Sequence, residues 1–328
     1  MSVVQSNKIQ GPSAWVASDF ENDNSWQHQL TQSTIETLNS ALRAAQASTL
    51  PIGQLTKHHF PIGEFKLELD NIADELENGR GFVLLKGLPV ERYSGGEIRI
   101  IYYGLGLHLG SPVRQNYNGD LLGVVMNVGD LNDAQTRVYE TNAYLPYHTD
   151  PSDVVGLLCL QPAKNGGLSS LVSTASVYNE IVENHPEFIA LYYRQFFSAH
   201  LGTKEPTYTP IFSYNEGKLS CRFLRQYLEL GHEMMNQPMS AVEIEAIDIF
   251  DSITHDPKMR INMMMEPGDI QLANNYAILH SRTEFEDYAE EALRRKKLRL
   301  WLKMPNARTL APDFPGRNGF PETKSRIT

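Results

Sequence analysis

The sequence predicts a mainly β protein with helices (α+β), built on a double-stranded β-helix, or jelly roll. Short apolar runs of strand length recur from residue 82 onward, separated by turn signals such as Asn215-Glu216-Gly217. Segments with helical spacing of their apolar residues precede these runs and interrupt them. No internal repeat, low-complexity tract or linker divides the chain. This pattern fits one jelly-roll core with N-terminal and inserted helices.

The N-terminal part predicts helices followed by the first strand. Residues 1–60 are polar and read as an N-terminal extension, with one helical segment near residues 31–42. The main domain then covers residues 61–328. It opens with an amphipathic helix over 65–78, which the glycines at 79 and 81 end. A short buried strand at 82–87 and a helix at about 96–109 follow.

The remaining elements are strands around a helical insert. The insert spans about 174–255, and helical spacing marks three segments in it. These segments are 177–182, 186–197 and 242–253. The predicted strands are 121–128, 154–160, 168–173, 261–265, 269–273 and 298–303, together with a hairpin over 212–221.

Composition limits the class of protein. The chain has 328 residues, 41% of them hydrophobic, which suffices for a substantial core. No stretch approaches eighteen apolar residues, and the first residues lack a basic-then-apolar export signal. Two scattered cysteines make no disulfide framework. With 29 basic against 39 acidic residues, nucleic acid is not an expected partner. We expect a cytoplasmic protein with no membrane partner.

The segment Leu145-Pro146-Tyr147-His148-Thr149-Asp150 carries a His and an Asp two residues apart. Side chains alternate along a strand, so His148 and Asp150 project from one face. His280 lies far downstream, after a turn and what reads as a strand ending at that residue. Two imidazoles and a carboxylate form the facial triad that suits non-haem Fe(II). A bare His-x-Asp pair is more often a surface pair, and a lone His is often a hydrogen-bonded core residue. Whether these three residues are metal ligands therefore depends on the motifs that accompany them.

Three further segments accompany the triad in a fixed order. Gly166-Gly167-Leu168-Ser169-Ser170 lies between the two His, and Ser281-Arg282-Thr283-Glu284-Phe285-Glu286-Asp287 follows His280. The run Leu293-Arg294-Arg295-Lys296-Lys297-Leu298-Arg299-Leu300-Trp301-Leu302 comes last. Together they resemble the taurine dioxygenase-like (TauD/TfdA) family of iron- and 2-oxoglutarate-dependent dioxygenases. The resemblance covers roughly residues 80 to 310.

The resemblance implies roles for the triad and for the basic run. His148, Asp150 and His280 would bind Fe(II) and leave positions for 2-oxoglutarate and O2. Arg295 would bind the distal carboxylate of 2-oxoglutarate, for which the planar guanidinium is suited. Arg299, four residues on and on the same face of the strand, would face the co-substrate or an acidic group of the substrate. The alternative for both is a solvated basic edge strand, the reading that we give to Arg294, Lys296 and Lys297.

Ser169 stands where the family commonly has a Thr that donates to the same carboxylate. A serine keeps the hydroxyl donor. Ser170 is the alternative, although the alternation of the strand would point it the other way. Trp301, beside Arg299 on the last strand, is expected to pack in the barrel wall.

The expected activity is hydroxylation of an unactivated C–H bond of a small, acid-bearing molecule, with release of succinate and CO2. Asp150 keeps the carboxylate that halogenating relatives lack, which favours hydroxylation over halogenation. Desaturation, cyclisation and cleavage of a C–heteroatom bond stay open. A jelly roll that only binds a small molecule is the alternative from another class. Substrate contacts are expected from loops near 115–118, 143–147 and 200–235, and a homo-oligomer is compatible with the resemblance.

Overall fold

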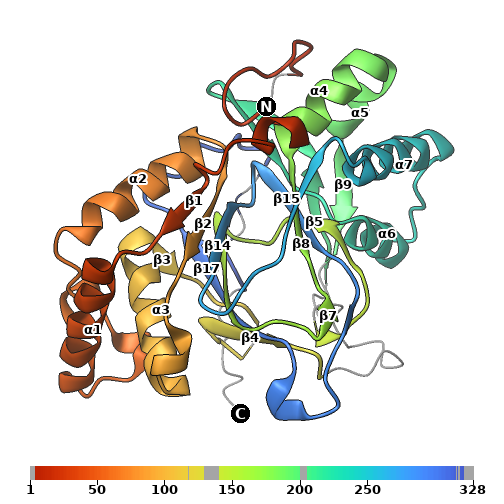
Figure 1. The fold of residues 1–328 in the computed structure, drawn as a ribbon. Coiled ribbons are helices and arrows are strands. Elements are labelled where there is room, and N and C mark those ends of the chain that lie inside the picture. The colour runs from red at the N-terminus through yellow and green to blue at the C-terminus, as the bar shows by residue number, and fades with distance from the viewer. Residues whose placement is uncertain are drawn as a thin grey trace, which may run out of the picture.

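Two β-sheets face each other in the computed structural model of the chain (Figure 1). The structure describes residues 4–116, 118–128, 140–199, 205–314, 316 and 318–320. The larger sheet has the order β1-β2-β14-β6-β17-β3, and β4 also pairs with β17. Its strands are β1 (Gln27–Gln29), β2 (Phe82–Lys86), β14 (Ile270–Asn274), β6 (Val154–Gln161), β17 (Lys296–Lys303), β3 (Ser111–Pro112) and β4 (Leu122–Met126).

The smaller sheet has the order β13-β8-β15-β5. Its strands are β13 (Arg260–Met263), β8 (Ser169–Ser173), β15 (Ile278–Arg282) and β5 (Leu145–His148). Apolar side chains from both sheets form a shared core, among them Phe82, Val155, Leu171 and Ile278. The predicted α+β fold, a two-sheet β core with N-terminal and inserted helices, is confirmed.

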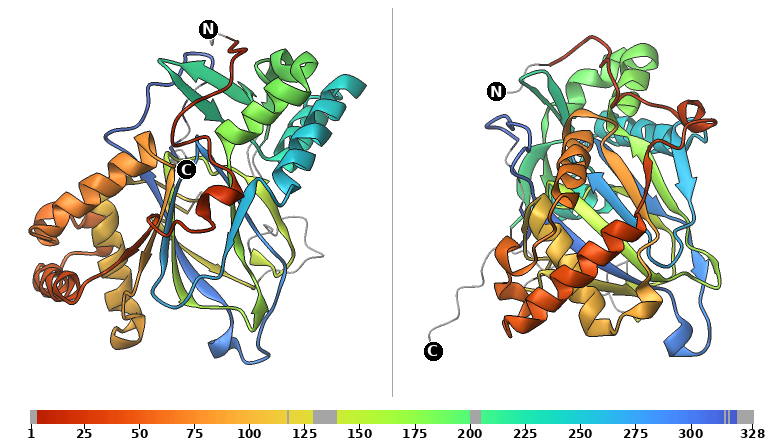
Figure 2. Two further views of the ribbon diagram at one scale, coloured as in Figure 1. Left: turned by 45° about the horizontal axis from the view of Figure 1, so that its top comes forward. Right: turned by 60° about the vertical axis from the view of Figure 1, so that its left-hand side comes forward.

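Three N-terminal helices cover the outer face of the larger sheet (Figures 1 and 2). They are α1 (Gln32–Ala47), α2 (Phe65–Asn78) and α3 (Gly95–Leu109). Side chains alternate between the two faces of β17. Leu298, Leu300 and Leu302 pack into the core shared with these helices. Lys297, Arg299 and Trp301, which alternate with these leucines, therefore face the interior between the sheets.

The inserted segment covers the outer face of the smaller sheet. Its helices are α4 (Thr174–Asn184), α5 (Ile189–Tyr192), α6 (Arg225–Met234) and α7 (Ala241–His255). Tyr147, Val172 and Leu279 of the sheet pack into a core with them. Short paired strands accompany the helices: β9 (Gln195–Ser198) with β10 (Thr207–Pro210), and β11 (Phe212–Asn215) with β12 (Lys218–Cys221). A further pair joins β7 (Asn165–Gly166) to β16 (Phe285–Glu286).

Two element predictions were wrong. The helix expected over 186–197 consists of a 3-10 turn at Pro186–Phe188 and the short α5, and Gln195–Ser198 is a strand. Aromatic and apolar residues are dense there, and both spacings fit so short a run. The strand expected to end at His280 is two strands, because the chain turns at 275–277 between β14 and β15. Helix α6 was not predicted.

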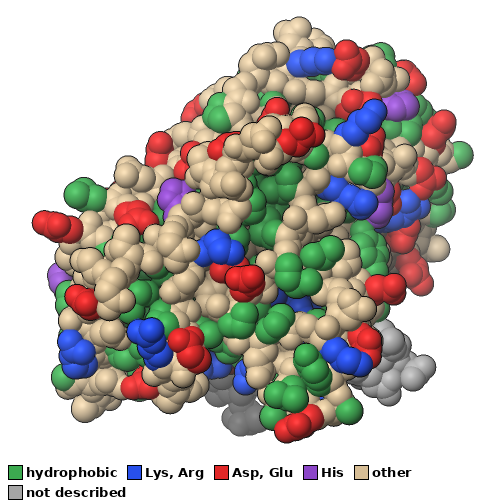
Figure 3. Space-filling model, in the orientation of Figure 1, with side chains coloured by type: hydrophobic (Ala, Val, Ile, Leu, Met, Phe, Trp, Pro, Cys, Tyr) green, Lys and Arg blue, Asp and Glu red, His purple; other side chains and the backbone are tan. Residues whose placement is uncertain are grey.

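The surface shows no gathering of charge on the face drawn in Figure 3, where Lys and Arg side chains are dispersed among acidic ones. Within the described residues, no helix is both long and apolar enough to cross a membrane. Cys159 and Cys221 are buried free thiols.

Candidate active site

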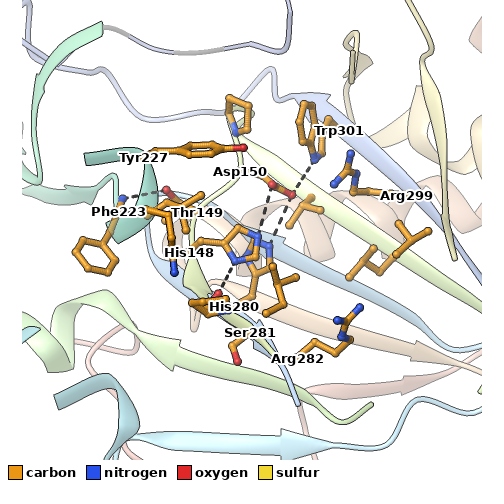
Figure 4. Close-up of a pocket in the computed structure, with 18 of the residues that line it drawn as sticks. His148, Thr149, Asp150, Phe223, Tyr227, His280, Ser281, Arg282, Arg299 and Trp301 are labelled. Atoms are coloured by element: carbon orange, nitrogen blue, oxygen red, sulfur yellow. Dashed lines mark hydrogen bonds and ion pairs between the residues drawn. The ribbon is translucent and has the colours of Figure 1, made fainter. Parts of the chain in front are cut away.

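The two sequence-predicted histidines lie on neighbouring strands. β5 pairs with β15 antiparallel, and the register places His280 opposite His148. Their ring centroids are 4.2 Å apart. Asp150 follows the end of β5, and its backbone N–H donates to Oδ1 of Asn275 at 3.0 Å, in the turn that leads into β15. The turn therefore fixes the carboxylate beside both rings (Figure 4).

The three side chains meet the requirements of a metal site. One ligand atom from each of His148, Asp150 and His280 lies within 4.8 Å of the others. Nε2 of His148 is 3.8 Å from Oδ1 of Asp150, and Nε2 of His280 is 3.7 Å from its Oδ2. These distances are too long for good hydrogen bonds, so all three side chains would be available to hold one ion. The set of two imidazoles and one carboxylate is the one that non-haem Fe(II) prefers.

The protonation states also suit a metal. Nδ1 of His148 donates to the carbonyl of Pro146 at 2.8 Å, so the lone pair of the neutral ring is on Nε2, facing Asp150. Burial and the neighbouring His280 lower the pKa of His148 to about 4. Burial alone would raise the pKa of Asp150, but His280 and Arg299 outweigh it and hold this pKa well below its usual range. At neutral pH the site offers a neutral His148 imidazole and an ionised carboxylate.

Trp301 takes part in the site as well as in the barrel wall where it was expected. Its side chain is 1% exposed, and its indole Nε1 donates to Oδ2 of Asp150 at 2.8 Å (Figure 4). The guanidinium of Arg299 lies 4.5 Å from the centre of the Trp301 ring. Trp301 thus restrains the orientation of the carboxylate. The sequence already indicated that Trp301 lies on the same face of its strand as Arg299, two residues away. It did not indicate the contact with Asp150.

Replacing Trp301 with Phe should weaken Fe(II) binding by about 10–100-fold, as is typical when a hydrogen-bond partner of a metal ligand is lost. The measurement is anaerobic Fe(II) titration followed by metal analysis. Trp15→Phe is the matched control, because Trp15 is also buried and its Nε1 also donates a hydrogen bond, to the carbonyl of Arg80. Equal Fe(II) affinities in the two variants would contradict the role of Trp301.

The basic run was only partly predicted. Arg295 and Arg299 both line the cavity that contains the triad, despite an irregular register between Lys296 and Lys297. Lys297 was expected on a solvated edge, and this was wrong. It is 2% exposed, and its Nζ lies 3.4 Å from Oγ of Ser169. The same alternation that pairs Arg295 with Arg299 also turns Lys297 inward.

A cationic cluster surrounds the end of the cavity that contains Arg295. The guanidinium carbons of Arg295 and Arg282 lie 5.1 Å and 4.7 Å from the centre of the Phe285 ring. Nη1 of Arg295 and Nε of Arg282 are buried and have no hydrogen-bond partner among the described residues. Burial and mutual repulsion lower the pKa of Arg282 to about 9, and burial lowers that of Arg295 to about 10. Arg282 was missed, although it lies two residues after His280 on one strand face.

Ser169 belongs to the same end of the cavity. The register of β8 and β15 places it opposite Arg282, and its side chain is 4% exposed. Ser170 points to the other face of the sheet, where its hydroxyl is 2.6 Å from the hydroxyl of Tyr147. The alternation of the strand therefore leaves Ser169 facing the cavity and directs Ser170 away from it.

The profile of a family described as "Taurine catabolism dioxygenase TauD, TfdA family" matches residues 47–301. The chain is also 31% identical over 310 residues to FR-33289 synthase of Streptomyces rubellomurinus, covering 92% of this chain and 91% of the relative. The chain belongs to the TauD/TfdA family. Like the other members it is an Fe(II)- and 2-oxoglutarate-dependent dioxygenase.

Other relatives agree in length and fold. Taurine hydroxylase-like protein SAT17 of Stachybotrys chartarum is 28% identical, over 91% of this chain and 80% of the relative. Asparagine oxygenase, solved with Fe(II), 3-hydroxyasparagine and succinate, has a TM-score of 0.68 at 16% identity, over 85% of this chain and 93% of that one. The oxygenase OrfP, solved with Fe and α-ketoglutaric acid, has a TM-score of 0.62 at 12% identity, over 84% and 94%.

In this member of the family, Gln115 orients one of the cavity arginines. Its Oε1 accepts from Nε of Arg299 at 2.8 Å, and its Nε2 donates to the backbone carbonyl of Arg299 at 2.7 Å. The loop that contains Gln115 was expected to contact substrate, but the Gln115 side chain is 1% exposed and holds Arg299 in place. Gly123 allows this, because a Cβ there would lie 2.6 Å from Oε1 of Gln115. Residue 117 of that loop is outside the described residues.

The cavity has a volume of about 380 Å³ and joins the triad to the cationic end. Leu145 and Pro146 line it from one of the loops expected to contact substrate. Residues of the expected 200–235 segment also line it: Arg222, Phe223, Leu224, Gln226, Tyr227 and Leu230. Residues 200–204 of that segment are not described.

Proposed function

We propose that the protein hydroxylates a C–H bond of a small, acid-bearing molecule, with conversion of 2-oxoglutarate to succinate and CO2. The observation that carries this is one cavity with a metal-ligand set at one end and a buried cationic cluster at the other. The metal-ligand set suits Fe(II), and the cationic cluster suits a carboxylate of 2-oxoglutarate. One cavity would therefore hold both the metal and the co-substrate.

His148, Asp150 and His280 would hold the iron, which when bound supplies the activation of O2 and the oxidation of the C–H bond. The protein's part is to position the reactants. Pro146 holds the tautomer of His148, and Trp301 holds the carboxylate. These contacts leave the open side of the triad to the cavity, where co-substrate and substrate would meet.

Arg295 would bind the distal carboxylate of 2-oxoglutarate, together with Ser169. The unpartnered Nη1 of Arg295 supports this role, because a buried cationic donor without an acceptor is costly unless a ligand supplies one. The distance from the metal ligands also supports this role. Arg282 lies two residues, or roughly 7 Å, beyond His280 along β15. Ser169 is opposite Arg282. A five-carbon dicarboxylate can span from the metal to that point.

Arg299 would bind an acidic group of the substrate near the metal. Its charge acts on Asp150, and its guanidinium is held by Gln115 and Trp301 rather than directed to the Arg295 end. We expect Arg299→Gln to raise KM for the substrate by at least about tenfold, the effect of losing a charge-assisted hydrogen bond. The dissociation constant of 2-oxoglutarate should stay within about twofold. A large rise in that constant instead would assign Arg299 to the co-substrate.

Two similarities support hydroxylation of a small molecule. Asparagine oxygenase was solved with a hydroxyasparagine, and OrfP with a hydroxy-arginine, each together with succinate. FR-33289 synthase, at 31% identity, is named for the formation of a specific compound, which fits a dedicated small-molecule substrate. The presence of Asp150 in the ligand set supports hydroxylation over halogenation.

Succinate release tests the proposal. Purified enzyme with Fe(II), 2-oxoglutarate and O2 is screened against amino acids, carboxylates, sulfonates and phosphonates, each beside an analogue with the acid group amidated or esterified. We expect stimulation by an acid and not by its neutral analogue, and a product that has gained one oxygen atom. Loss of two hydrogens would indicate desaturation or cyclisation, and two fragments would indicate cleavage. Stimulation only by neutral compounds would contradict the acid-bearing substrate.

A further inference from the structure

Lys297 is a buried cation with no carboxylate partner among the described residues. Its Nζ contacts Sδ of Met265 at 2.9 Å and Oγ of Ser169 at 3.4 Å, and both are weak or neutral acceptors. The acid whose charge reaches it, Asp269, is paired with Lys86 at 3.3 Å. An ammonium group has three donors, and burying it without an anionic partner is strongly unfavourable. The position therefore requires a compensating anion or the loss of the proton.

The groups around Lys297 favour loss of the proton while the cavity is empty. Arg295 before β17 and Arg282 on β15 add positive charge, and Asp269 before β14 adds negative charge. Cys159 on β6 is neutral, because burial raises the pKa of its thiol. Burial, followed by the charges of Arg295 and Arg282, lowers the pKa of Lys297 to about 7. Near neutral pH the empty site thus holds a mixture of amine and ammonium.

We propose that Lys297 is a second cationic contact for the distal carboxylate of 2-oxoglutarate, beside Arg295, and that binding of the co-substrate brings a proton from solvent onto its Nζ. The proposal rests on the function proposed above, since it assumes that 2-oxoglutarate occupies this cavity. The step is balanced: the amine gains one solvent proton, and the carboxylate stays ionised. No bond of the co-substrate changes.

Three positions agree with this assignment. Ser169 both lines the cavity and contacts Lys297, so the ammonium lies just beyond a residue that faces the co-substrate. Lys297 is buried on the interior face of β17, Arg295 lines the cavity two residues before it, and Arg282 on β15 is opposite Ser169. Asp287 adds one negative charge beside Arg295 and Arg282, and Asp269 is paired with Lys86. A carboxylate among these groups would balance positive charge that these two acids leave.

Affinity measurements on the Fe(II)-loaded enzyme under argon test the contact. We expect Lys297→Met to weaken binding of 2-oxoglutarate at pH 7 by at least about tenfold, which corresponds to one charge-assisted hydrogen bond. Fe(II) affinity should be unchanged. Lys296→Met is the matched control, because Lys296 is the adjacent residue and is only half-buried. Its affinity for 2-oxoglutarate should equal that of the wild type.

The pH dependence separates a proton-coupled contact from a packing effect. Above pH 7 the wild-type affinity should fall by up to tenfold per pH unit, because the proton must be taken from an increasingly basic solvent. Affinity of Lys297→Met should be nearly independent of pH between 7 and 9. Calorimetry in two buffers of different ionisation enthalpy should show uptake of close to one proton by the wild type at pH 8.5, and none by Lys297→Met.

Thermal unfolding shows whether Lys297→Met is stably folded. The pKa of Lys297 is lower in the folded state than in the unfolded chain, so the unfolded chain keeps this proton to a higher pH. The folded state is therefore destabilised most below pH 7, where the buried amine must be charged. Ligand-free Lys297→Met should therefore be at least as stable as the wild type at pH 6–7. Lys297→Gln is the second variant should methionine fit poorly.

Two results would overturn the proposal: 2-oxoglutarate affinity of both Lys297 variants equal to that of the wild type, or a wild type that takes up no proton at pH 8.5. Failure of the wild type itself to bind 2-oxoglutarate would be a different result. It would contradict the proposed function, and not only the role of Lys297.

Discussion

Replacing Asp150 with Asn should abolish tight Fe(II) binding and all substrate-stimulated release of succinate. The substitution keeps the shape of the side chain and an oxygen that can accept the hydrogen bond from Trp301. It removes the negative charge of the carboxylate, whose oxygens lie 3.7–3.8 Å from the two histidine Nε2 atoms. Loss of a ligand should cost more than the 10–100-fold typical of its hydrogen-bond partners. We expect Fe(II) affinity to fall at least 100-fold, as measured by anaerobic titration.

The control for this prediction is His58→Ala, an exposed histidine far from the site in sequence, which should leave Fe(II) affinity unchanged. Thermal unfolding of metal-free Asp150→Asn should show a folded protein. Retention of wild-type Fe(II) affinity by a folded Asp150→Asn variant would refute the proposed ligand set.

Replacing Arg295 with Leu should raise the dissociation constant of 2-oxoglutarate by about 100-fold or more. Arg295 is 4% exposed, stacks on Phe285 and has a donor without a partner, so it is built to receive an acceptor from the cavity. Charged hydrogen bonds to a buried carboxylate contribute about 1.5–3 kcal/mol each, and a guanidinium can make two. The measurement is anaerobic titration with 2-oxoglutarate in the presence of Fe(II).

Arg294→Leu provides the comparison at the neighbouring position. Arg294 is only half-buried and donates to the carbonyls of Tyr288 and Ala289, outside the cavity. It should bind 2-oxoglutarate as the wild type does. Equal weakening in the two variants would mean that general positive charge, and not the position of Arg295, attracts the co-substrate.

Alternation along strands made much of the site predictable. The interior positions of β17 are two residues apart, so period two assigns them to one face. The same rule placed Asp150 beside His148, but Asp150 lies beyond the end of β5, where a hydrogen bond to Asn275 positions it. The pairing of β5 with β15 depends on the whole fold and is not readable from the residues. It was the family resemblance that joined His280 to the other two.

The missed contacts depend on geometry that local sequence does not encode. Trp301 on β17 contacts Asp150 after β5, and Arg299 on β17 contacts Gln115 between β3 and β4, so each contact joins segments far apart in the sequence. Lys297 is different, because the alternation already placed it inside. The expectation that a lysine lies in solvent overrode the pattern, and a buried cation of this kind is a sign of function.

The most direct test of the account is the visible metal-to-ligand charge-transfer band of the Fe(II)–2-oxoglutarate chelate, recorded as the protein is titrated under argon with Fe(II) and then with 2-oxoglutarate. The account predicts a weak band that appears only after both are added, is absent in Asp150→Asn and requires far more 2-oxoglutarate in Arg295→Leu. A folded wild-type protein that gives no band would contradict it.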